Sequence, residues 1–505
     1  MSLAIVHSRA TLGMGAPRVT VEVHLSQGLP GITMVGLPET TVRESRDRVR
    51  SAIINSGFSW PARKVTINLA PADLPKEGGR FDLPIALALL AASEQIPADK
   101  LAGCEFMGEL ALTGELRGVP GAIPCAIAAL DAGHLIVVAT ENENEVGLIL
   151  RPGCLLAGHL TEVCAFLTGQ LELKKPVSQP LVNIEPDADI IDIIGQQHGK
   201  RALEISAAGE HSLLLIGPPG TGKTMLASRL NGLLPSLSNK EALESAAITS
   251  LVDSYAARRQ WQQRPFRAPH HSASLYAMVG GGTIPMPGEI SLAHNGVLFL
   301  DELPEFDRRV LDALREPLES GQIHLSRSRA KLTYPANFQL IAAMNPSPGG
   351  HYQGIKQSQP AHTLRYLQRL SGPFLDRFDL SVEIPLLPPG TLSNQKPTGE
   401  TSHTVKERVA RTRIRQLERQ GKLNARLNSA EVCRECKLQD VDAEWLEQAL
   451  IRLGLSVRAW QRLLKVSRTI ADIENEVNIS RTHLQEALGY RAMDRLLHYL
   501  QQLQT

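Results

Sequence analysis

The sequence predicts an α/β protein in which a largely parallel sheet is covered by helices, with an α+β domain before it and a helical region after it. Residues 187–389 repeat a strand–loop–helix pattern around the short apolar strands LLLIG, GVLFLDE and FQLIAAMN, which is typical of buried parallel sheets. Residues 1–168 mix strand-like and alanine-rich helical stretches, whereas residues 390–505 show helical periodicity without a convincing strand. The polar, proline-containing segment 169–186 is expected to be a linker.

The composition limits the classes of function. A net charge of +1 over 505 residues excludes a strong global field, so any site for a polyanion must come from local clustering. Aromatic residues make up only 4%, which argues against a surface that stacks many bases. The six cysteines have no disulfide-framework spacing, and no signal peptide or membrane-length apolar run is present. We therefore expect a reduced, cytoplasmic protein without a membrane partner.

A phosphate-binding loop is the strongest motif. HSLLLIGPPGTGKTMLASRL places a glycine-rich loop between an apolar strand and a helical pattern. Glycines let backbone N–H groups surround a β-phosphate, the lysine reaches the β- and γ-oxygens, and the threonine hydroxyl ligates Mg²⁺. The predicted cofactors are ATP and Mg²⁺, and the predicted binding residues are Gly217, Pro218, Pro219, Gly220, Thr221, Gly222, Lys223 and Thr224.

Polar residues follow two further strands. Asp301 and Glu302 end GVLFLDE, and Asn345 ends FQLIAAMN. Asp301 would hold the magnesium together with Thr224, and Glu302 would polarise the attacking water. Asn345 could orient the same water or touch the γ-phosphate.

Two arginines are candidates for neutralising the γ-phosphate. Arg377, in PFLDRFDL, could be supplied by a neighbouring subunit, which would couple hydrolysis to assembly. The alternative is an ion pair within the chain, to Asp376 or Asp379. Arg458, in GLSVRAWQRLL, could reach the phosphate from the helical region or be an ordinary surface arginine.

The run FRAPHHSASLYAMVGGGTIPMPGEISLAHNGVLFLDE, residues 266–302, resembles the hallmark of magnesium-chelatase-type AAA+ ATPases. The whole chain is similar to the ComM/YifB branch of that group. The resemblance implies an AAA+ core with a helical lid, a sensor at Asn345, an arginine finger at Arg377 and a second sensor arginine at Arg458. It also implies a hexameric ring.

The resemblance further implies that two segments project into the central pore: the glycine-rich span 280–288 and a hairpin at 322–335. The hairpin tip, Ser326-Arg327-Ser328-Arg329-Ala330-Lys331, carries three positive charges and no large apolar side chain. Arg327, Arg329 and Lys331 are therefore expected to contact a DNA backbone, whose binding is electrostatic and independent of sequence. The alternative is an ordinary solvated hairpin.

The N-terminal domain resembles the catalytic half of Lon-type proteases, which have the ribosomal S5 domain 2-like fold. The resemblance rests on residues 64–92 and 108–133. In that family a lysine activates a serine nucleophile. Here the serine position falls on Arg80, or on Phe81 if the register shifts by one, and the lysine position falls on Cys125. We therefore expect a binding or ring-assembly module without peptidase activity.

Three weaker patterns allow more than one interpretation. Residues 404–426 carry eight basic side chains, which could form a DNA track or the solvated face of a helix whose buried side holds Val405, Val409, Ile414 and Leu417. Cys433 and Cys436 have metal spacing but no evident second pair. His270 and His271 should point to opposite sides if they lie on a strand.

We expect an ATP-dependent hexameric DNA motor, a helicase or branch-migration translocase that acts in homologous recombination, for example when incoming DNA is integrated during natural transformation. Its partners would be single-stranded and branched DNA, with recombination proteins as further candidates. The main alternative is a magnesium-chelatase-like remodelling ATPase that acts on a protein or metal-insertion partner. A protein-unfolding motor typically needs an aromatic-hydrophobic pore loop; the tip 326–331 lacks one, and Tyr276 and Met278 offer only a weak version of it.

Overall fold

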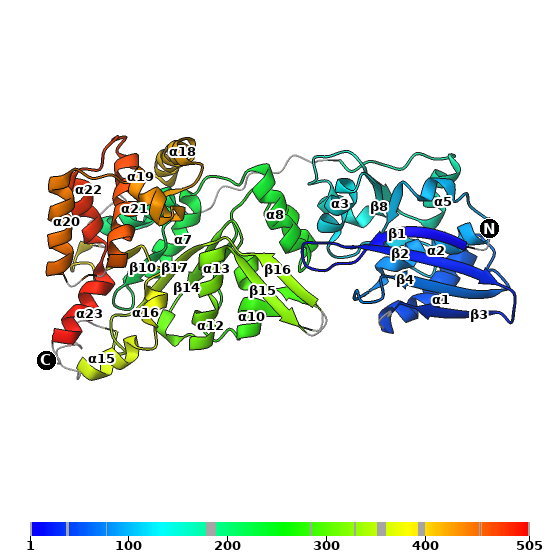
Figure 1. The fold of residues 1–505 in the computed structure, drawn as a ribbon, viewed down its shortest axis with the longest axis horizontal. Coiled ribbons are helices and arrows are strands. Elements are labelled where there is room, and N and C mark those ends of the chain that lie inside the picture. The colour runs from blue at the N-terminus through cyan, green and yellow to red at the C-terminus, as the bar shows by residue number, and fades with distance from the viewer. Residues whose placement is uncertain are drawn as a thin grey trace.

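The computed structural model describes residues 3–36, 40–76, 78–177, 188–282, 285–327, 330–350, 360–391, 399–453, 455 and 457–502. Figure 1 shows an elongated molecule with one sheet at the N-terminal end, a second sheet in the middle and a group of helices at the C-terminal end. Part of the predicted linker is described, and its Lys174 carbonyl accepts a hydrogen bond from the Leu156 amide at 2.8 Å.

The N-terminal lobe is built on a mixed seven-stranded sheet. Its strand order is β3-β4-β2-β1-β5-β8-β9. The β1–β2 and β2–β4 pairs are antiparallel and the other four neighbouring pairs are parallel. The strands are β1 (Leu3–Arg9), β2 (Arg18–Ser26), β3 (Gly31–Val35), β4 (Lys64–Ala70), β5 (Cys104–Phe106), β8 (Leu135–Ala139) and β9 (Cys154–Ala157), and a small hairpin is formed by β6 (Glu109–Leu110) and β7 (Leu116–Arg117). The helices are α1 (Thr40–Asn55), α2 (Asp82–Ala92), α3 (Ala122–Asp131), α4 (Glu143–Val146) and α5 (Leu160–Thr168).

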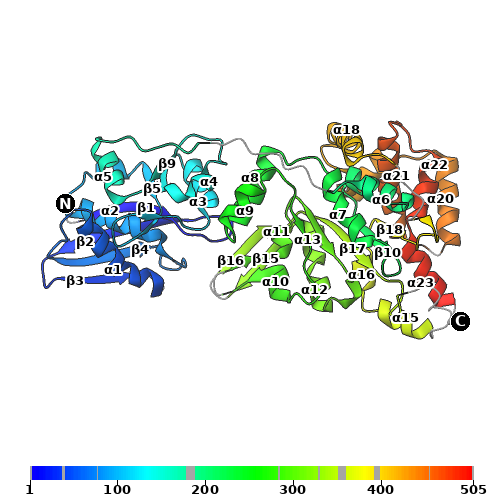
Figure 2. The same ribbon diagram turned by 180° about the vertical axis from the view of Figure 1, so that it is seen from behind.

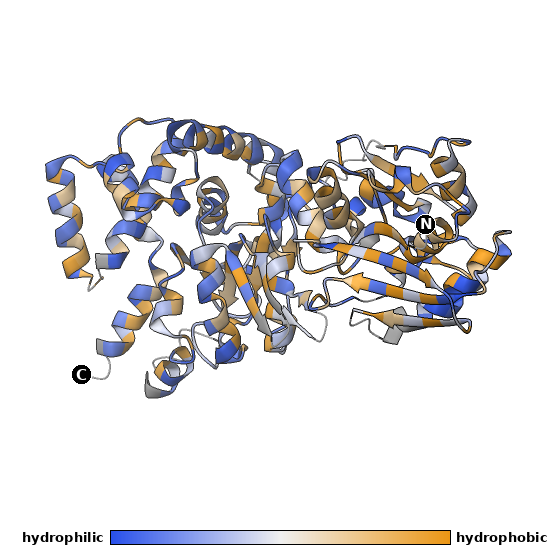
Figure 3. Ribbon diagram, turned by 45° about the vertical axis from the view of Figure 1, so that its right-hand side comes forward, coloured by the Kyte–Doolittle hydropathy of each residue, from blue (hydrophilic) through white to orange (hydrophobic). Residues whose placement is uncertain are grey.

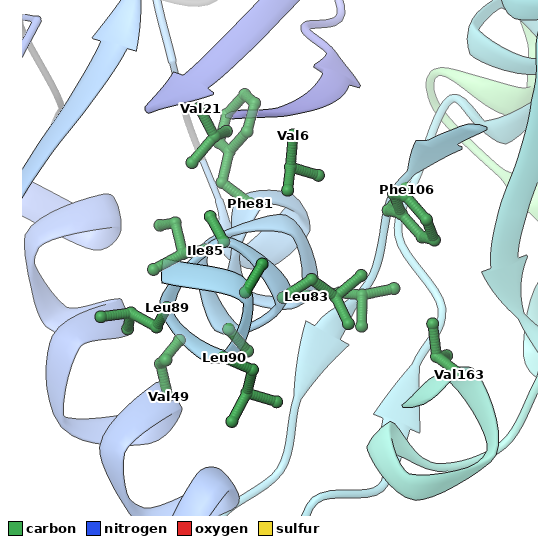
Figure 4. Close-up of a cluster of buried hydrophobic side chains, with 14 of the residues drawn as sticks. Val6, Val21, Val49, Phe81, Leu83, Ile85, Leu89, Leu90, Phe106 and Val163 are labelled. Carbon is green, nitrogen blue, oxygen red and sulfur yellow. The ribbon is translucent and has the colours of Figure 1, made fainter. Parts of the chain in front are cut away.

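Helix α2 is the centre of this lobe. Every residue from Asp82 to Ala92 is buried, and the close-up shows its side chains radiating towards β1, β2, α1 and α5 (Figure 4). A helix that is apolar on all sides has to be enclosed. Its single charged residue, Asp82, is paired with Arg48 at 2.9 Å and accepts a hydrogen bond from the Leu110 amide. The run LPIALALLAA is therefore a core helix.

The second sheet has five parallel strands in the order β11-β14-β17-β10-β18. They are β10 (Leu213–Ile216), β11 (Phe266–Arg267), β14 (Val297–Leu300), β17 (Gln339–Met344) and β18 (Leu380–Glu383). Alternate residues of β10 belong to different hydrophobic clusters: Leu213 and Leu215 pack on one face of the sheet, and Leu214 and Ile216 on the other. Both faces are buried, which explains the unbroken apolar runs in the sequence.

Helices and two hairpins surround this sheet. The helices are α6 (Gln197–Gly209), α7 (Lys223–Leu233), α8 (Asn239–Ser250), α9 (Ser254–Arg259), α10 (Leu275–Val279), α11 (Glu289–Leu292), α12 (Arg308–Ala313), α13 (Arg315–Ser320), α15 (Pro360–Leu367) and α16 (Gly372–Leu375). One hairpin is β12 (Gly280–Gly281) with β13 (Met286–Pro287), and the other is β15 (Gln322–Arg327) with β16 (Ala330–Pro335). The sequence-predicted hairpin at 322–335 is thus present.

The C-terminal region consists of α18 (Ser402–Gln420), α19 (Ser429–Glu435), α20 (Asp440–Arg452), α21 (Val457–Ile473), α22 (Arg481–Gly489) and α23 (Ala492–Gln502). Hydrophilic and hydrophobic residues alternate along these helices, as expected for helices with one buried face (Figure 3). The expected buried face of α18 is only half right: Val405 and Val409 are buried, but Ile414 and Leu417 are exposed. Thr412, Arg413 and Gln416 complete the buried face instead, because α18 packs on α6 through hydrogen bonds to helix-end carbonyls.

The two lobes share a hydrophobic cluster. Helices α8 and α9 lie between the two sheets, next to α3 and α4 (Figure 2). Ala246, Ala247 and Ala257 of these helices are buried in the same cluster as Ile123 and Ala126 of α3. The Gly121 amide also donates a hydrogen bond to the Ser250 carbonyl at 3.2 Å. This contact joins the N-terminal lobe directly to the second sheet's helices.

Glu145, on the short helix α4 that contacts α9, gives a prediction about stability and pH. Burial raises the pKa of its carboxyl group to about 7, against 4.5 in an unfolded chain. Between these values the folded state keeps a proton that the unfolded state has lost, so stability falls as the pH rises through this window. We expect Glu145→Gln to stabilise the protein by roughly 1 to 3 kcal/mol at pH 8 and by much less at pH 5.

The measurement is the melting temperature at both pH values. Glu172→Gln, which removes the same charge from an exposed position, serves as the control and should leave the melting temperature unchanged. A Glu145→Gln protein whose melting temperature is equal to or below that of the wild type at pH 8 would contradict the prediction.

Candidate nucleotide site

Three strands of the second sheet end at one edge with the predicted polar residues. The loop 217–222 follows β10, Asp301 and Glu302 follow β14, and Asn345 follows β17. Because these strands are parallel and neighbouring, their carboxyl ends meet at the same edge of the sheet. The structure therefore brings together the polar residues that the sequence places at three separate strand ends.

The loop before α7 needs its glycines for two reasons. Gly220 and Gly222 have φ angles of +76° and +85°, which only glycine adopts at little cost. A Cβ on Gly217 would lie 2.2 Å from the Ile384 carbonyl oxygen, so a side chain there would push the loop off β18. Helix α7 begins at Lys223, directly after the loop. Its first backbone N–H groups can therefore bind a phosphate.

The side chain of Lys223, the first residue of α7, folds back onto the loop. Its Nζ donates to the carbonyl oxygens of Gly217 and Pro218, both at 2.8 Å, and to Asn345 Oδ1 at 3.2 Å. Burial lowers the pKa of this lysine, an effect that the nearby Asp301 opposes. A cation that is held only by neutral oxygens can exchange them for phosphate oxygens. The contact with Asn345 links the lysine to the predicted sensor position.

Thr224 and Asp301, the two residues that the sequence predicts to hold magnesium, lie in contact. The Thr224 hydroxyl donates to Asp301 Oδ2 at 2.6 Å, although the two residues are 77 positions apart. An adjacent hydroxyl and carboxylate supply the oxygen ligands that Mg²⁺ prefers. This donor set fits the metal, and these two residues would hold it beside a bound triphosphate.

Glu302 has a partner that the sequence does not reveal. One of its carboxylate oxygens, Oε2, lies 2.9 Å from His271 Nδ1, and Glu302 has a φ of +53°. The expectation that His270 and His271 point to opposite sides is wrong: their rings lie side by side, with centroids 4.1 Å apart. The reason is that β11 ends at Arg267, so the alternation of a strand does not apply to these two residues.

Gln196 is a second residue that sequence reasoning missed. Its side-chain amide donates to the Pro385 carbonyl at 2.8 Å and to the Thr221 carbonyl at 3.4 Å. It therefore fastens the phosphate loop to the segment that follows β18. A single glutamine before a helix carries no recognisable sequence signal.

Arg377 lies at the amino ends of the parallel strands, whereas the phosphate loop lies at their carboxyl ends. It precedes β18, whose first residue, Leu380, pairs in parallel with Leu213, the first residue of β10. The phosphate loop follows the other end of β10, and four strand residues span about 13 Å. The guanidinium of Arg377 contacts Glu319, not Asp376 or Asp379, the two ion-pair partners considered from the sequence.

Arg458 lies in the same cavity as Arg377, a space of about 430 Å³ at the amino edge of the sheet. Asp376 holds it at 3.1 Å and holds Arg462 at 2.8 Å. Arg377 Nε is buried without a hydrogen-bond partner in the part of the chain that the structure describes. Burial and the charges of Arg315, Arg458 and Arg462 lower the pKa of Arg377. Glu210, Glu319, Asp376 and Asp379 line the same cavity, so its cations are paired within the chain in this structure.

The predicted DNA contacts are placed only in part. Arg327 ends β15 and pairs with Ala330, and Lys331 of β16 pairs with Ser326. Arg327 and Lys331 therefore lie at the distal end of the hairpin, where their side chains are outside the described residues, as is the whole of Arg329. At the base of the hairpin, the Tyr334 hydroxyl donates to the Pro285 carbonyl at 2.7 Å.

The basic residues of 404–426 mostly serve the fold. Arg408 pairs with Glu204 and Glu400, Arg413 donates to the Ala207 carbonyl, Arg415 to the Asp472 carbonyl, Arg419 pairs with Asp472, Lys422 with Glu431, and Arg426 with Glu210. These six side chains already form ion pairs or hydrogen bonds within the chain. A continuous DNA track along this segment is therefore not supported.

The N-terminal lobe has no nucleophile at the expected position. Arg80 is buried and donates to the Pro120 carbonyl at 3.0 Å, and burial raises the pKa of the Cys125 thiol. Lys76 Nζ is enclosed by the carbonyl oxygens of Gly36, Pro71 and Leu74, and the Ser93 hydroxyl donates to the Leu89 carbonyl. Neither Lys76 nor Ser93 is free to form a catalytic dyad.

Two further expectations concern metals and membranes. Within the described ranges, no group of three or more histidine, cysteine or acidic side chains is arranged to hold a metal ion, and Cys436 is buried whereas Cys433 is exposed. The zinc interpretation of this pair is therefore not supported. No helix in the described part of the chain has the length and apolar character needed to cross a bilayer.

Comparison with known proteins agrees with this arrangement. Family models for the magnesium chelatase subunit ChlI match residues 189–392 and 21–142, and the model for the C-terminal part of ChlI matches residues 399–491. The fold, the phosphate loop and these matches define a magnesium-chelatase-like AAA+ ATPase.

Individual relatives narrow the assignment. The protein YifB of Escherichia coli is 69% identical over 506 residues, with both chains covered completely. The competence protein ComM of Haemophilus influenzae is 61% identical, with 99% of each chain covered. The magnesium-chelatase 38 kDa subunit of Rhodobacter capsulatus is 26% identical over 214 residues, which are 38% of this chain and 54% of that subunit. The chain belongs to the ComM/YifB family.

Proposed function

We propose that this protein is an ATP-driven DNA motor that works as a hexameric ring and exchanges strands at branched DNA. The observation that carries the proposal is the separation of Arg377 from the phosphate loop of its own chain by the length of β10 and β18. An arginine at the amino edge of the sheet can serve only a nucleotide that a neighbouring subunit presents. ATP hydrolysis would then require assembly.

The chemistry of each subunit follows from the carboxyl edge of its sheet. The loop amides and Lys223 bind the phosphates, and Thr224 and Asp301 hold Mg²⁺, which neutralises charge on the β- and γ-phosphates. Glu302 accepts a proton from the attacking water, while Asn345, already in contact with Lys223, orients that water. Arg377 and Arg458 of the next subunit stabilise the charge that develops on the γ-phosphate.

DNA is the substrate that best fits the hairpin β15–β16 and the relatives. The distal end of the hairpin carries three cationic residues, and one full-length relative is named a competence protein. A competence-related role in the cytoplasm, where incoming DNA recombines, requires a machine that handles single-stranded and branched DNA. The hairpins of six subunits would line the channel of the ring.

The hairpin prediction can be tested with Arg327→Ala, Arg329→Ala and Lys331→Ala combined. We expect loss of most DNA-stimulated ATPase activity, and a slope of log affinity against log salt that is shallower by at least about 2. A matched control removes three exposed positive charges elsewhere, at Lys240, Arg411 and Lys437, and should change neither quantity. Wild-type stimulation and salt dependence in the hairpin variant would show that the tip does not contact DNA.

The function itself is tested with a three- or four-stranded DNA junction, purified protein and ATP. We expect strand exchange that depends on Lys223, Glu302 and Arg377. If rings form and hydrolyse ATP but leave every junction intact, the DNA motor is excluded.

The family models favour one alternative, a chelatase-like ATPase that remodels a protein or metal-insertion partner. It predicts ATPase activity that DNA does not stimulate. ATPase activity measured with and without the DNA junction separates the two functions.

A further inference from the structure

The N-terminal lobe carries a cluster of cations that neither the nucleotide site nor the hairpin β15–β16 uses. Arg50 lies near the end of α1, and Arg63 and Lys64 lie after the following turn, where the chain enters β4. All three side chains are exposed. Within the residues that the structure describes, none of the three forms an ion pair. Because the net charge of the whole chain is only +1, this cluster is a local concentration of positive charge.

Two acidic residues near the cluster leave its charge largely uncompensated. Asp47, which precedes Arg50 on α1, is paired with Arg46 at 3.1 Å. Glu94 acts on Arg63 electrostatically, but it is fully exposed. Water and salt screen an interaction of this kind. The cluster is therefore open to an anion from outside the chain.

Arg50 is held in place by an aromatic ring. Its guanidinium carbon lies over Trp60, 5.9 Å from the ring centroid, which is a cation–π contact. Trp60 is half-buried and packs against the core of the lobe. The turn before Trp60 is fixed by Gln95, whose side-chain amide exchanges two hydrogen bonds of 2.8 Å with the backbone of Ser59. Because Arg50 is restrained before a ligand arrives, a contact with it costs less conformational entropy.

An exposed and restrained arginine among other cations fits a single strand of nucleic acid. A guanidinium plane stacks on an unpaired base, and Arg63 and Lys64 can bind neighbouring phosphates. A duplex keeps the faces of its bases covered, so it cannot make the stacking contact. The hairpin β15–β16 and α1 both lie on the lower side of the molecule (Figure 1). A strand that leaves the hairpin can therefore continue along this side towards Arg50.

We propose that Arg50, Arg63 and Lys64 form a second contact for single-stranded DNA, separate from the hairpin. The proposal rests on the proposed function, because it takes DNA as the substrate. The N-terminal lobe then holds a strand that the motor has separated and keeps it from pairing again.

The test measures how the full-length protein binds a fluorescein-labelled oligothymidylate over a range of salt concentrations. With Arg50→Ala, Arg63→Ala and Lys64→Ala combined, we expect the affinity to fall at least about 5-fold. The slope of log affinity against log salt should become shallower by about 2, because each phosphate contact to a single strand contributes about 0.7. ATP turnover without DNA should stay at the wild-type rate. The control removes three exposed cations elsewhere and should change none of these quantities: Arg18→Ala, Lys100→Ala and Lys175→Ala.

Arg50→Lys separates stacking from charge. Lysine keeps the positive charge but has no plane that can stack on a base. We expect the affinity for the oligothymidylate to fall about 3-fold or more, with the salt slope unchanged. The melting temperature should match that of the wild type, because Arg50 is exposed. An Arg50→Lys protein that binds as tightly as the wild type would overturn the contact with a base.

The failure of this proposal and that of the proposed function are distinguishable. Wild-type affinity and salt slope in the Arg50, Arg63 and Lys64 variant, with the hairpin variant still defective, would overturn the second contact and leave the DNA motor standing. A wild-type protein that does not bind the oligothymidylate would overturn both.

The same variant is also tested on phosphatidylglycerol vesicles, because exposed cations next to a tryptophan suit an anionic lipid surface as well. We expect no vesicle binding by the wild-type protein. Vesicle binding that the variant loses, together with unchanged binding of the oligothymidylate, would overturn the proposal in favour of a membrane contact.

Discussion

Replacement of Glu302 by glutamine is expected to reduce ATP turnover by at least about a hundredfold, because the amide cannot accept the proton of the attacking water. The residues that bind the nucleotide are unaffected: Lys223 stays among the loop carbonyls and Thr224 next to Asp301. ATP should therefore bind with near-normal affinity and remain uncleaved. Rings trapped in this state should stay on DNA, which a gel-shift assay and a fluorescent nucleotide titration would detect together.

Glu305→Gln is the matched control. Glu305 lies three residues further along and pairs with Arg369 at 3.0 Å, so its loss changes the same charge near the same edge without touching the phosphate site. Normal turnover by Glu302→Gln rings would contradict the assignment of the base.

Replacement of Arg377 by alanine is expected to reduce ATP turnover about a thousandfold, which is in the range of the rate enhancement that arginine fingers provide. The defect should be repaired between subunits. Lys223→Ala subunits cannot use their own nucleotide but still offer Arg377, whereas Arg377→Ala subunits offer an intact phosphate loop. Each variant alone should be inactive, and a one-to-one mixture should regain up to about a quarter of wild-type activity, since one interface in four then combines both intact parts.

The control is Arg309→Ala, which removes an exposed arginine that pairs with its neighbour Asp307. This variant should keep its activity without being mixed with another. A mixture that forms rings but remains inactive would show that Arg377 does not act across the subunit interface.

The sequence predicts which residues meet at the carboxyl ends of the strands, because each part of this pattern is local. A short apolar strand followed by glycines, by Asp-Glu or by asparagine announces a strand end, and parallel strands bring such ends together. The contact of Thr224 with Asp301, 77 residues away, follows from that rule alone. This rule does not depend on how the side chains pack.

What the sequence could not predict depends on contacts between distant elements. The basic residues of α18 look available for DNA, yet Arg413 lies inside and donates to the Ala207 carbonyl, 206 residues earlier. Periodicity identifies a helix but not which face its neighbour covers, so Ile414 and Leu417 were assigned to the wrong side. Likewise, nothing local reveals that Asp376 gathers Arg458 and Arg462, or that β11 ends before His271.

The shared cluster formed by Ala246, Ala247 and Ala257 with the helix Ala122–Asp131 has a practical meaning for experiments. A fragment that lacks the first lobe would expose small apolar side chains of α8 and α9 to water. We expect such a fragment to aggregate. Because α8 packs against α3, a movement of α8 during the ATP cycle would move the first lobe with it.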